Sequence, residues 1–311
     1  MTAFLATSLA WADPPILSLP LACDLPKQCR VTSLVDHDPS RGFRDYRGLN
    51  LTYDGHKGTD FAITRKSVFH RGIHVLAAAP GRVVGVRNTM PDRNVVGVGT
   101  STVVGRECGN GVRLDLGSGW EMQYCHMRWG SITVKRGARV ERGQKLGLIG
   151  LSGRSEYPHL HVQVVHNGRV VDPFFPSRLW SGSIVSKLTP TSVVIGRAGL
   201  SGWVPSFSVL RSGRAKPPSP HAPALVAWVE LFGVRRGDRL RWQILSPNGR
   251  TFLETSTRMK KNSVHWFGHA GKKRYDLPWP SGQYRVRVEL YRDLEIPMAV
   301  NESSHELPSV P

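Results

Sequence analysis

Five residues in three separate motifs have side chains that could hydrolyse a substrate at a bound metal ion. The motifs are His56-Lys57-Gly58-Thr59-Asp60, the single His126, and His159-Leu160-His161. Residues i and i+2 of a strand project to the same face, so His159 and His161 are expected to point into one site. Two imidazoles and one carboxylate form a good zinc set, and they leave a fourth position open for water, as catalytic sites do.

The base that activates such a water has to be a histidine here. The sequence has no His-Glu-x-x-His motif, and His305-Glu306 lacks the second histidine. A single carboxylate leaves the centre positively charged, which polarises a substrate carbonyl and lowers the pKa of bound water toward about 7. An isolated histidine is more often a structural or surface residue, and we expect this of His37, His70, His74, His166, His265 and His269.

Short β-strands separated by glycine turns are expected to carry the three motifs. Gly (32 residues) and Pro (22 residues) are abundant, and helical periodicity is hard to find. Two runs of strand-forming residues flank Gly117-Ser118-Gly119, which predicts a hairpin over residues 111–126. Asn167-Gly168 predicts a second tight turn. Further strands are expected at residues 75–78, 82–86, 145–150 and 160–165.

The four cysteines predict two disulfides. An even number of cysteines behind an export signal indicates an oxidising compartment. Cys23 with Cys29 would close a small loop, and Cys108 with Cys125 would join the two arms of one hairpin. Adjacent strand residues point to opposite faces, so Cys125 is expected to brace its strand from behind, away from His126.

The N-terminus predicts export to the periplasm or the extracellular space. Residues 1–12 form a short apolar stretch that ends in Ala10-Trp11-Ala12, as a signal peptide does, although its basic first part is missing. A buried first strand is the alternative, and Pro14-Pro15 argues against it. No apolar run reaches the roughly 18 residues of a membrane span.

The net charge of +19 raises the question whether the protein binds nucleic acid or an anionic matrix such as a cell envelope. Residues 50–175 contain 17 Lys and Arg against 9 Asp and Glu, and residues 189–311 contain 18 against 9. The excess is therefore spread over both halves, and no nucleic-acid motif accompanies it. We expect a solvated basic surface or affinity for an anionic cell envelope, and no nucleic-acid partner. The oligomeric state does not follow from the sequence.

The length of 311 residues is enough for two domains of ordinary size. Strict alternation of apolar and polar residues over 284–290 predicts a half-buried antiparallel strand in the second half. The expected organisation is a signal peptide at 1–12, an N-terminal arm at 13–49, a first domain at 50–175, a linker at 176–190, an immunoglobulin-like β-sandwich at 191–300 and a tail at 301–311.

The motifs of residues 50–175 resemble lysostaphin/LytM-type peptidases, and they occur in the same order. An ordered set of this kind is far more specific than one His-x-His. The matching segments are Tyr53-Asp54-Gly55-His56-Lys57-Gly58-Thr59-Asp60, Val75-x-Ala77-Ala78-x-Pro80-Gly81-x-Val83, Tyr124-Cys125-His126-Met127, Gly150-x-Ser152-Gly153-Arg154 and Pro158-His159-Leu160-His161, followed by Val171-Asp172-Pro173.

This resemblance implies one Zn²⁺ per chain, held by His56, Asp60 and His161, with His126 and His159 as catalytic residues. It also implies an all-β domain whose antiparallel sheet forms a barrel-like groove. Two features depart from the family. Val162-Gln163 replaces the usual Phe-Glu, and a long insert at residues 86–107 is expected to form a loop over the groove.

The resulting prediction is a zinc-dependent metalloendopeptidase that hydrolyses peptide bonds in peptidoglycan cross-links or stem peptides. One alternative is a catalytically silent envelope protein that activates a cell-wall amidase. Silent relatives have lost metal ligands, whereas this sequence keeps all of them. A second alternative is a peptidase that acts on proteins.

Overall fold

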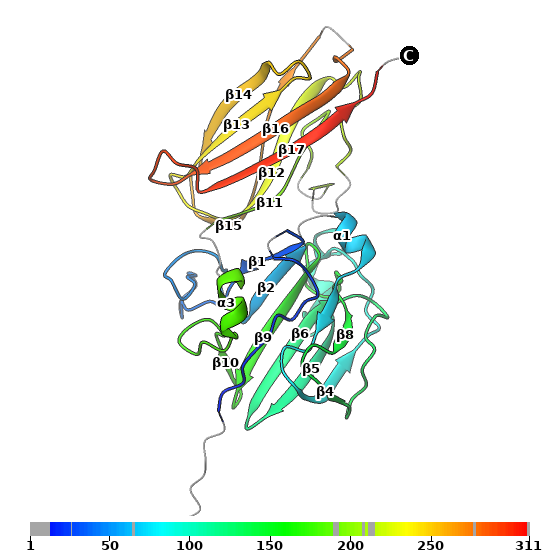
Figure 1. The fold of residues 1–311 in the computed structure, drawn as a ribbon, viewed down its shortest axis with the longest axis vertical. Helices are drawn as coiled ribbons and strands as arrows, with labels where there is room; N and C mark the ends of the chain where they lie inside the picture. Colours follow the sequence, from blue (N-terminus) through cyan, green and yellow to red (C-terminus); the bar gives the residue numbers. More distant parts are fainter. Residues whose placement is uncertain are drawn as a thin grey trace, which may run out of the picture.

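The computed structural model describes residues 13–25, 27–63, 66–188, 193–206, 209–210, 215–275 and 278–309. The predicted signal peptide at 1–12 lies outside them. Figure 1 shows a unit built on one large sheet, and above it along the long axis a second unit built of strands. The described elements are mostly strands, which confirms the all-β fold class.

One antiparallel sheet of eight strands organises the first unit. Its order is β1-β2-β9-β6-β5-β4-β7, and β10 pairs with β9 at one end. A separate two-stranded sheet joins β3 to β8. The strands are β1 (Cys29–Ser33), β2 (Thr59–Ile63), β3 (His74–Leu76), β4 (Gly81–Arg87), β5 (Asn110–Gly117), β6 (Trp120–Met127), β7 (Arg139–Val140), β8 (Lys145–Leu148), β9 (His159–His166) and β10 (Arg169–Val171).

The expected hairpin over residues 111–126 is confirmed as β5 and β6. Its turn residues Gly117, Ser118 and Gly119 all have positive φ, which glycine adopts without a Cβ penalty. The second predicted turn joins β9 to β10. Strand β2 was not predicted as a strand, although it carries the end of the first motif.

One face of the large sheet packs against a hydrophobic core, and the predicted site residues lie on the other face. Side chains alternate along β6, so Met122 and Tyr124 are fully buried in the core. The N-terminal arm completes this core, because Leu17 and Leu21 are buried in it. The arm is therefore packed against the first unit, and residues 29–33 within it form the edge strand β1.

Short helical segments lie between the strands in the described part of the chain. They are α1 (Lys66–Arg71), α2 (Val95–Val98), the 3₁₀ turn η1 (Thr100–Val103) and α3 (Gly182–Leu188). Segments α2 and η1 lie in the insert that was predicted as a loop, and α3 lies in the predicted linker. No helix in the described part of the chain is long and apolar enough to cross a membrane.

The second unit is a sandwich of two antiparallel sheets that share one core. The sheets have the orders β11-β12-β15 and β14-β13-β16-β17, and side chains of both sheets, including the fully buried Trp242, fill the space between them. An immunoglobulin-like topology stays a prediction. The strands are β11 (Val194–Ser201), β12 (Ala224–Val234), β13 (Arg239–Leu245), β14 (Thr251–Arg258), β15 (Ser263–Lys273), β16 (Gly282–Tyr291) and β17 (Ala299–Leu307).

The predicted tail at 301–311 is wrong for most of its length. Residues 299–307 form β17, which pairs with β16 from Gly282↔Leu307 to Leu290↔Ala299. Residues 301–306 of this strand are all polar, and every second side chain is exposed to solvent because the strand lies at the edge of its sheet. That polarity made the segment resemble a solvated tail.

Candidate metal centre

His56, Asp60 and His161 converge on one point of the large sheet. His56 Nε2 lies 3.1 Å from Asp60 Oδ1 and 3.1 Å from His161 Nδ1. His161 Nδ1 lies 2.9 Å from the same carboxylate oxygen. Asp60 on β2 is paired directly with His161 on β9, and directly opposed residues share a face. The three ligand atoms are all within 4.8 Å of one another.

Main-chain contacts hold His56 from behind. Its Nδ1 lies 2.6 Å from the Leu34 carbonyl oxygen, and donation there leaves the Nε2 lone pair directed at Asp60. Asp36 fixes the preceding turn, because its carboxylate accepts the Gly55 N–H at 2.9 Å. Tyr53 stacks on the imidazole with ring centroids 4.3 Å apart. The ring is therefore fixed before any metal binds.

This donor set fits a zinc ion. Tetrahedral zinc with bonds of about 2.0–2.2 Å places its ligand atoms about 3.3 Å apart, close to the separations seen here. Burial alone would raise the pKa of Asp60, but His56 and His159 hold it well below its usual value, so the carboxylate is ionised. A buried anion between converging imidazole nitrogens is the arrangement that a divalent cation requires.

His126 and His159 lie beside this cluster on the same side of the sheet. Their ring centroids are 4.6 Å apart, and His159 Nε2 is 3.8 Å from Asp60 Oδ1. Each ring is oriented through Nδ1, which lies 2.9 Å from the Ser152 carbonyl oxygen in His126 and 2.8 Å from the Tyr157 carbonyl oxygen in His159. Nδ1 of each ring is therefore occupied, and Nε2 is available to a molecule in the groove. Burial lowers the pKa of His126 well below its usual value, and His159 and His161 act in the same direction.

The expectation that Cys125 and His126 point to opposite faces is wrong. Between β5 and β6 the pairing passes from Val112↔Tyr124 to Asn110↔Met127, so Gly111 alone faces two residues of β6. This is a β-bulge, and His126 in it has a φ of 61°. The bulge turns His126 onto the face that Cys125 already occupies, and both residues line the groove.

Both predicted disulfides are present, Cys23–Cys29 and Cys108–Cys125. The second lies on the site face and ties the bulge to Cys108, two residues before the start of β5. The Cys108 carbonyl oxygen also accepts the His126 N–H at 2.8 Å. The disulfide therefore helps to hold the backbone of a candidate catalytic residue.

The five predicted residues line one groove of about 710 Å³. The insert contributes Val95, Thr100 and Glu107 to its lining, in agreement with the expected loop over the groove. Gln163, at the position of the family's usual glutamate, also lines it. It is paired directly with Gln123 on β6 and so faces the same side as the histidines.

His265 was predicted to be a structural or surface residue, and the structure places it in this groove together with Phe232. The two rings stack at 4.5 Å on paired strands β15 and β12. Both contact Tyr157, at 5.7 and 5.5 Å between centroids. The second unit thus forms part of the wall of the site.

Sequence reasoning could have found two of the additional residues. Tyr53 and Tyr157 lie within three residues of a predicted ligand or catalytic histidine. Phe232 and His265 give no such signal, because they are far from every motif in the chain.

Comparison with known proteins identifies the first unit. Residues 54–173 match the model of Peptidase family M23, in agreement with the family that the motifs of residues 50–175 resemble. The match contains all five residues discussed above. It leaves the N-terminal arm and the sandwich outside.

Among curated proteins, peptidoglycan DD-endopeptidase ShyA of Vibrio cholerae is 33% identical over 117 residues, which is 38% of this chain and 22% of that protein. ShyB of the same organism is 32% identical over 117 residues, with the same shares. The chain therefore matches about a fifth of the length of these relatives. Among solved structures, the catalytic domain of lysostaphin from Staphylococcus simulans is 26% identical, with 45% of this chain and 90% of that chain covered and a TM-score of 0.30.

Proposed function

We propose that this protein is a zinc-dependent endopeptidase that cleaves peptide bonds in bacterial peptidoglycan, with one zinc ion held by His56, Asp60 and His161. The observation that carries the proposal is the convergence of these three side chains within 3.1 Å of one another, inside a groove. The names of the relatives, peptidoglycan DD-endopeptidases, support the substrate class.

Zinc bound here would polarise the scissile carbonyl and acidify a water molecule. The chain itself supplies the proton transfers through His126 and His159. Because Nδ1 of each ring is held by a main-chain carbonyl, a neutral ring presents a lone pair at Nε2 and can accept the proton of the attacking water. The other ring, once protonated, donates a hydrogen bond to the developing oxyanion.

The location of the protein is part of the same proposal. Two disulfides fit an oxidising compartment, and a peptidoglycan substrate lies outside the cytoplasmic membrane. The charge of +19 adds attraction to the anionic envelope. We therefore propose that the protein is exported to the periplasm or the cell surface.

The test separates metal binding from catalysis in the full chain. His161→Ala is expected to lose the zinc, because it removes one of three protein ligands. His126→Ala is expected to keep most of the zinc and to lose turnover of purified sacculi by about 10²–10⁴-fold, the usual effect of losing a proton-transfer group. Metal analysis and mass spectrometry of the released muropeptides measure the two quantities.

His166→Ala is the matched control, because His166 lies on the same strand as His161 but stacks on Trp120, at 4.1 Å, outside the groove. It should retain both zinc and turnover. Full zinc content in His161→Ala would contradict the ligand assignment. A zinc-loaded protein that releases no muropeptide but stimulates an amidase would favour the silent-activator alternative.

A further inference from the structure

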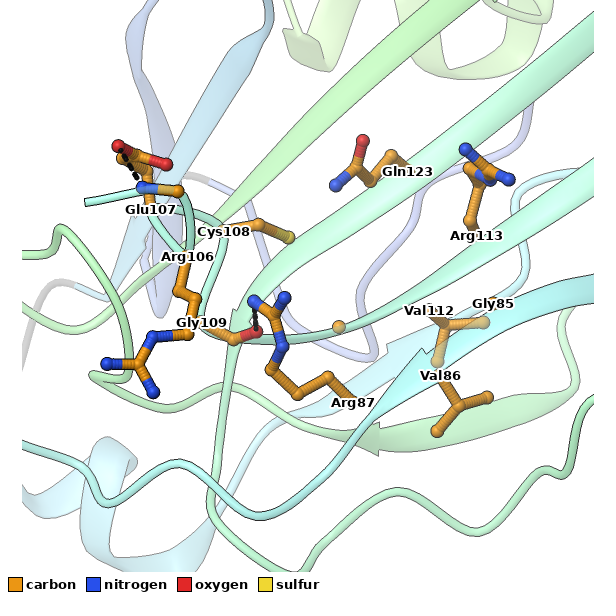
Figure 2. A pocket seen from close by; sticks show the side chains of 12 residues that line it. Gly85, Val86, Arg87, Arg106, Glu107, Cys108, Gly109, Val112, Arg113 and Gln123 are labelled. Atoms are coloured by element: carbon orange, nitrogen blue, oxygen red, sulfur yellow. Dashed lines mark hydrogen bonds between the residues drawn. The ribbon is translucent and has the colours of Figure 1, made fainter. Parts of the chain in front are cut away.

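A second pocket, of about 410 Å³, continues the groove away from the metal centre. The two hollows share the lining residues Glu107, Cys108 and Gln123, so they form one continuous depression. Figure 2 shows the second pocket, with Arg87 in the middle of the view and Arg106 and Arg113 on opposite sides of it. The peptidase mechanism proposed above uses none of these arginines.

The strand register shows why this pocket opens on the same face as the metal centre. His161 is paired with Cys125, two residues after Gln123 on β6. Gln123 is paired with Arg113 on β5, and Arg113 is paired with Gly85 on β4. Because paired residues share a face and every second residue returns to it, this face runs without interruption from β9 to β4.

Glycines make the pocket hollow. Gly85 and Gly111 place no side chain on this face, and Gly111 is paired with Arg87. A Cβ at Gly111 would lie 3.0 Å from Cys108 Sγ and would collide with the Tyr124 carbonyl oxygen. The floor of the pocket is therefore main chain, and a substrate segment can approach it closely.

Positive charge dominates the described lining of this pocket, which contains three arginines and one acidic residue, Glu107. Backbone contacts hold two of the arginines in place. Arg87 Nη1 donates to the Gly109 carbonyl oxygen at 3.1 Å, and Arg106 Nη2 donates to the Thr102 carbonyl oxygen at 3.3 Å.

The other two charged residues have partners of their own. The Nε of Arg113 lies 3.5 Å from the exposed Glu121 carboxylate. Glu107 accepts the Gly105 N–H at 2.9 Å. A guanidinium has five N–H donors in a planar fork, so one contact leaves it able to bind a carboxylate.

We propose that this pocket is a carboxylate-binding subsite, which receives an acidic part of the peptide substrate through Arg87 and Arg113. The inference rests on the proposed peptidase function and deepens it. Three strand steps separate β9 from β4, about 14 Å at the usual spacing between strands. An extended peptide covers that distance in about four residues, so the carboxylate is about four residues from the scissile bond.

The experiment compares two probes on the zinc-loaded full chain. One probe is soluble muropeptides released from sacculi by a muramidase, and the other is the same material with its carboxylates converted to amides. Arg87→Gln/Arg113→Gln is compared with Arg82→Gln, a control on the strand of Arg87 that removes one positive charge where the double variant removes two, and Arg82 is not among the residues that line the pocket. Both kcat/KM and binding to chelator-treated protein are measured.

On the untreated muropeptides, kcat/KM of the double variant is expected to fall about tenfold, equivalent to about 1.4 kcal/mol. It should stay within about twofold of the wild type on the amidated ones, and Arg82→Gln should match the wild type on both. Equal losses on both probes, or no loss on either, would overturn the subsite. If the double variant does not fold, the single variant Arg113→Gln is compared on the two probes instead. Arg113 contacts only an exposed carboxylate through Nε, so its replacement is not expected to prevent folding.

Binding of the probes to chelator-treated protein tests this inference separately from the proposed peptidase activity. If the wild type cleaves neither probe, the peptidase proposal fails. A preference of chelator-treated wild type for untreated muropeptides, reduced in the double variant, still supports the carboxylate site. Equal binding of both probes by the wild type overturns it.

Discussion

At the residue scale, a residue that binds no metal can still determine where a proposed metal ligand lies. Gly58 shows this clearly, because the His161 ring lies directly over it. A Cβ at position 58 would lie 2.7 Å from both Cε1 and Nε2 of His161 and would collide with the Val162 carbonyl oxygen. A glycine is therefore required here by the close approach of an imidazole and a neighbouring strand.

Gly58→Ala is expected to displace His161 and to weaken zinc binding by about 10–100-fold, as the loss of other groups that orient a ligand does. Overpacking should also lower the free energy of unfolding by about 1–3 kcal/mol. Gly182→Ala serves as the control, because a Cβ there meets nothing within 4 Å. Competitive zinc titration and thermal melts measure the effects, and unchanged zinc affinity in Gly58→Ala would refute this role.

At the scale of elements, the bulge in β6 decides where His126 points. Regular alternation would bury this side chain on the core face with Tyr124. The positive φ of His126 reverses its direction, and the Cys108–Cys125 disulfide closes over the irregular pairing. The disulfide therefore helps to hold the backbone of the proposed catalytic residue His126.

Removing this disulfide with Cys108→Ser/Cys125→Ser is expected to lower kcat by more than tenfold, because His126 can relax toward regular strand geometry. Stability should fall by about 3 kcal/mol, the usual value for a loop of this length. Cys23→Ser/Cys29→Ser is the control, since it removes a disulfide of the N-terminal arm, at a somewhat smaller cost in stability because the closed loop is shorter. Equal activity of the two variants at a temperature where both are folded would show that the bulge does not need the disulfide.

At the scale of the whole molecule, the sandwich is fixed to the first unit and completes its groove. Asn50 Nδ2 donates to the Val234 carbonyl oxygen at 2.6 Å, and Phe232 belongs to the core of the first unit. Behind the groove, Glu230 Oε1 lies 2.8 Å from His265 Nε2. Burial alone would raise the pKa of Glu230, but Arg197 and His265 lower it to about 2, so this carboxylate stays ionised and fixes the imidazole.

His265→Ala is therefore expected to lower kcat/KM on muropeptides about three- to tenfold while zinc content stays unchanged, because it alters the groove wall and no ligand. His269→Ala, on the same strand β15 but outside the groove lining, should behave as the wild type. Steady-state kinetics with metal analysis provides the comparison. Zinc loss in His265→Ala would show that the wall supports the metal centre instead of the substrate.

The sequence by itself predicted the five residues that the structure brings together in one groove, and most of the strands that carry them. Local spacing is sufficient where the geometry is local, as it is for His159 and His161, which are two residues apart on one strand. The hairpin β5–β6 and both disulfides followed from turn glycines and cysteine spacing for the same reason.

Only the tertiary structure decided the face of His126, the strand β17 and the presence of Phe232 and His265 in the groove. A bulge changes side-chain direction without any sequence signal of its own, because the extra residue is defined by the partner strand. An edge strand with solvated side chains has the composition of a tail. Residues of a second domain enter a site through the packing of two cores, which depends on contacts between segments far apart in the chain and leaves no periodic pattern in either segment.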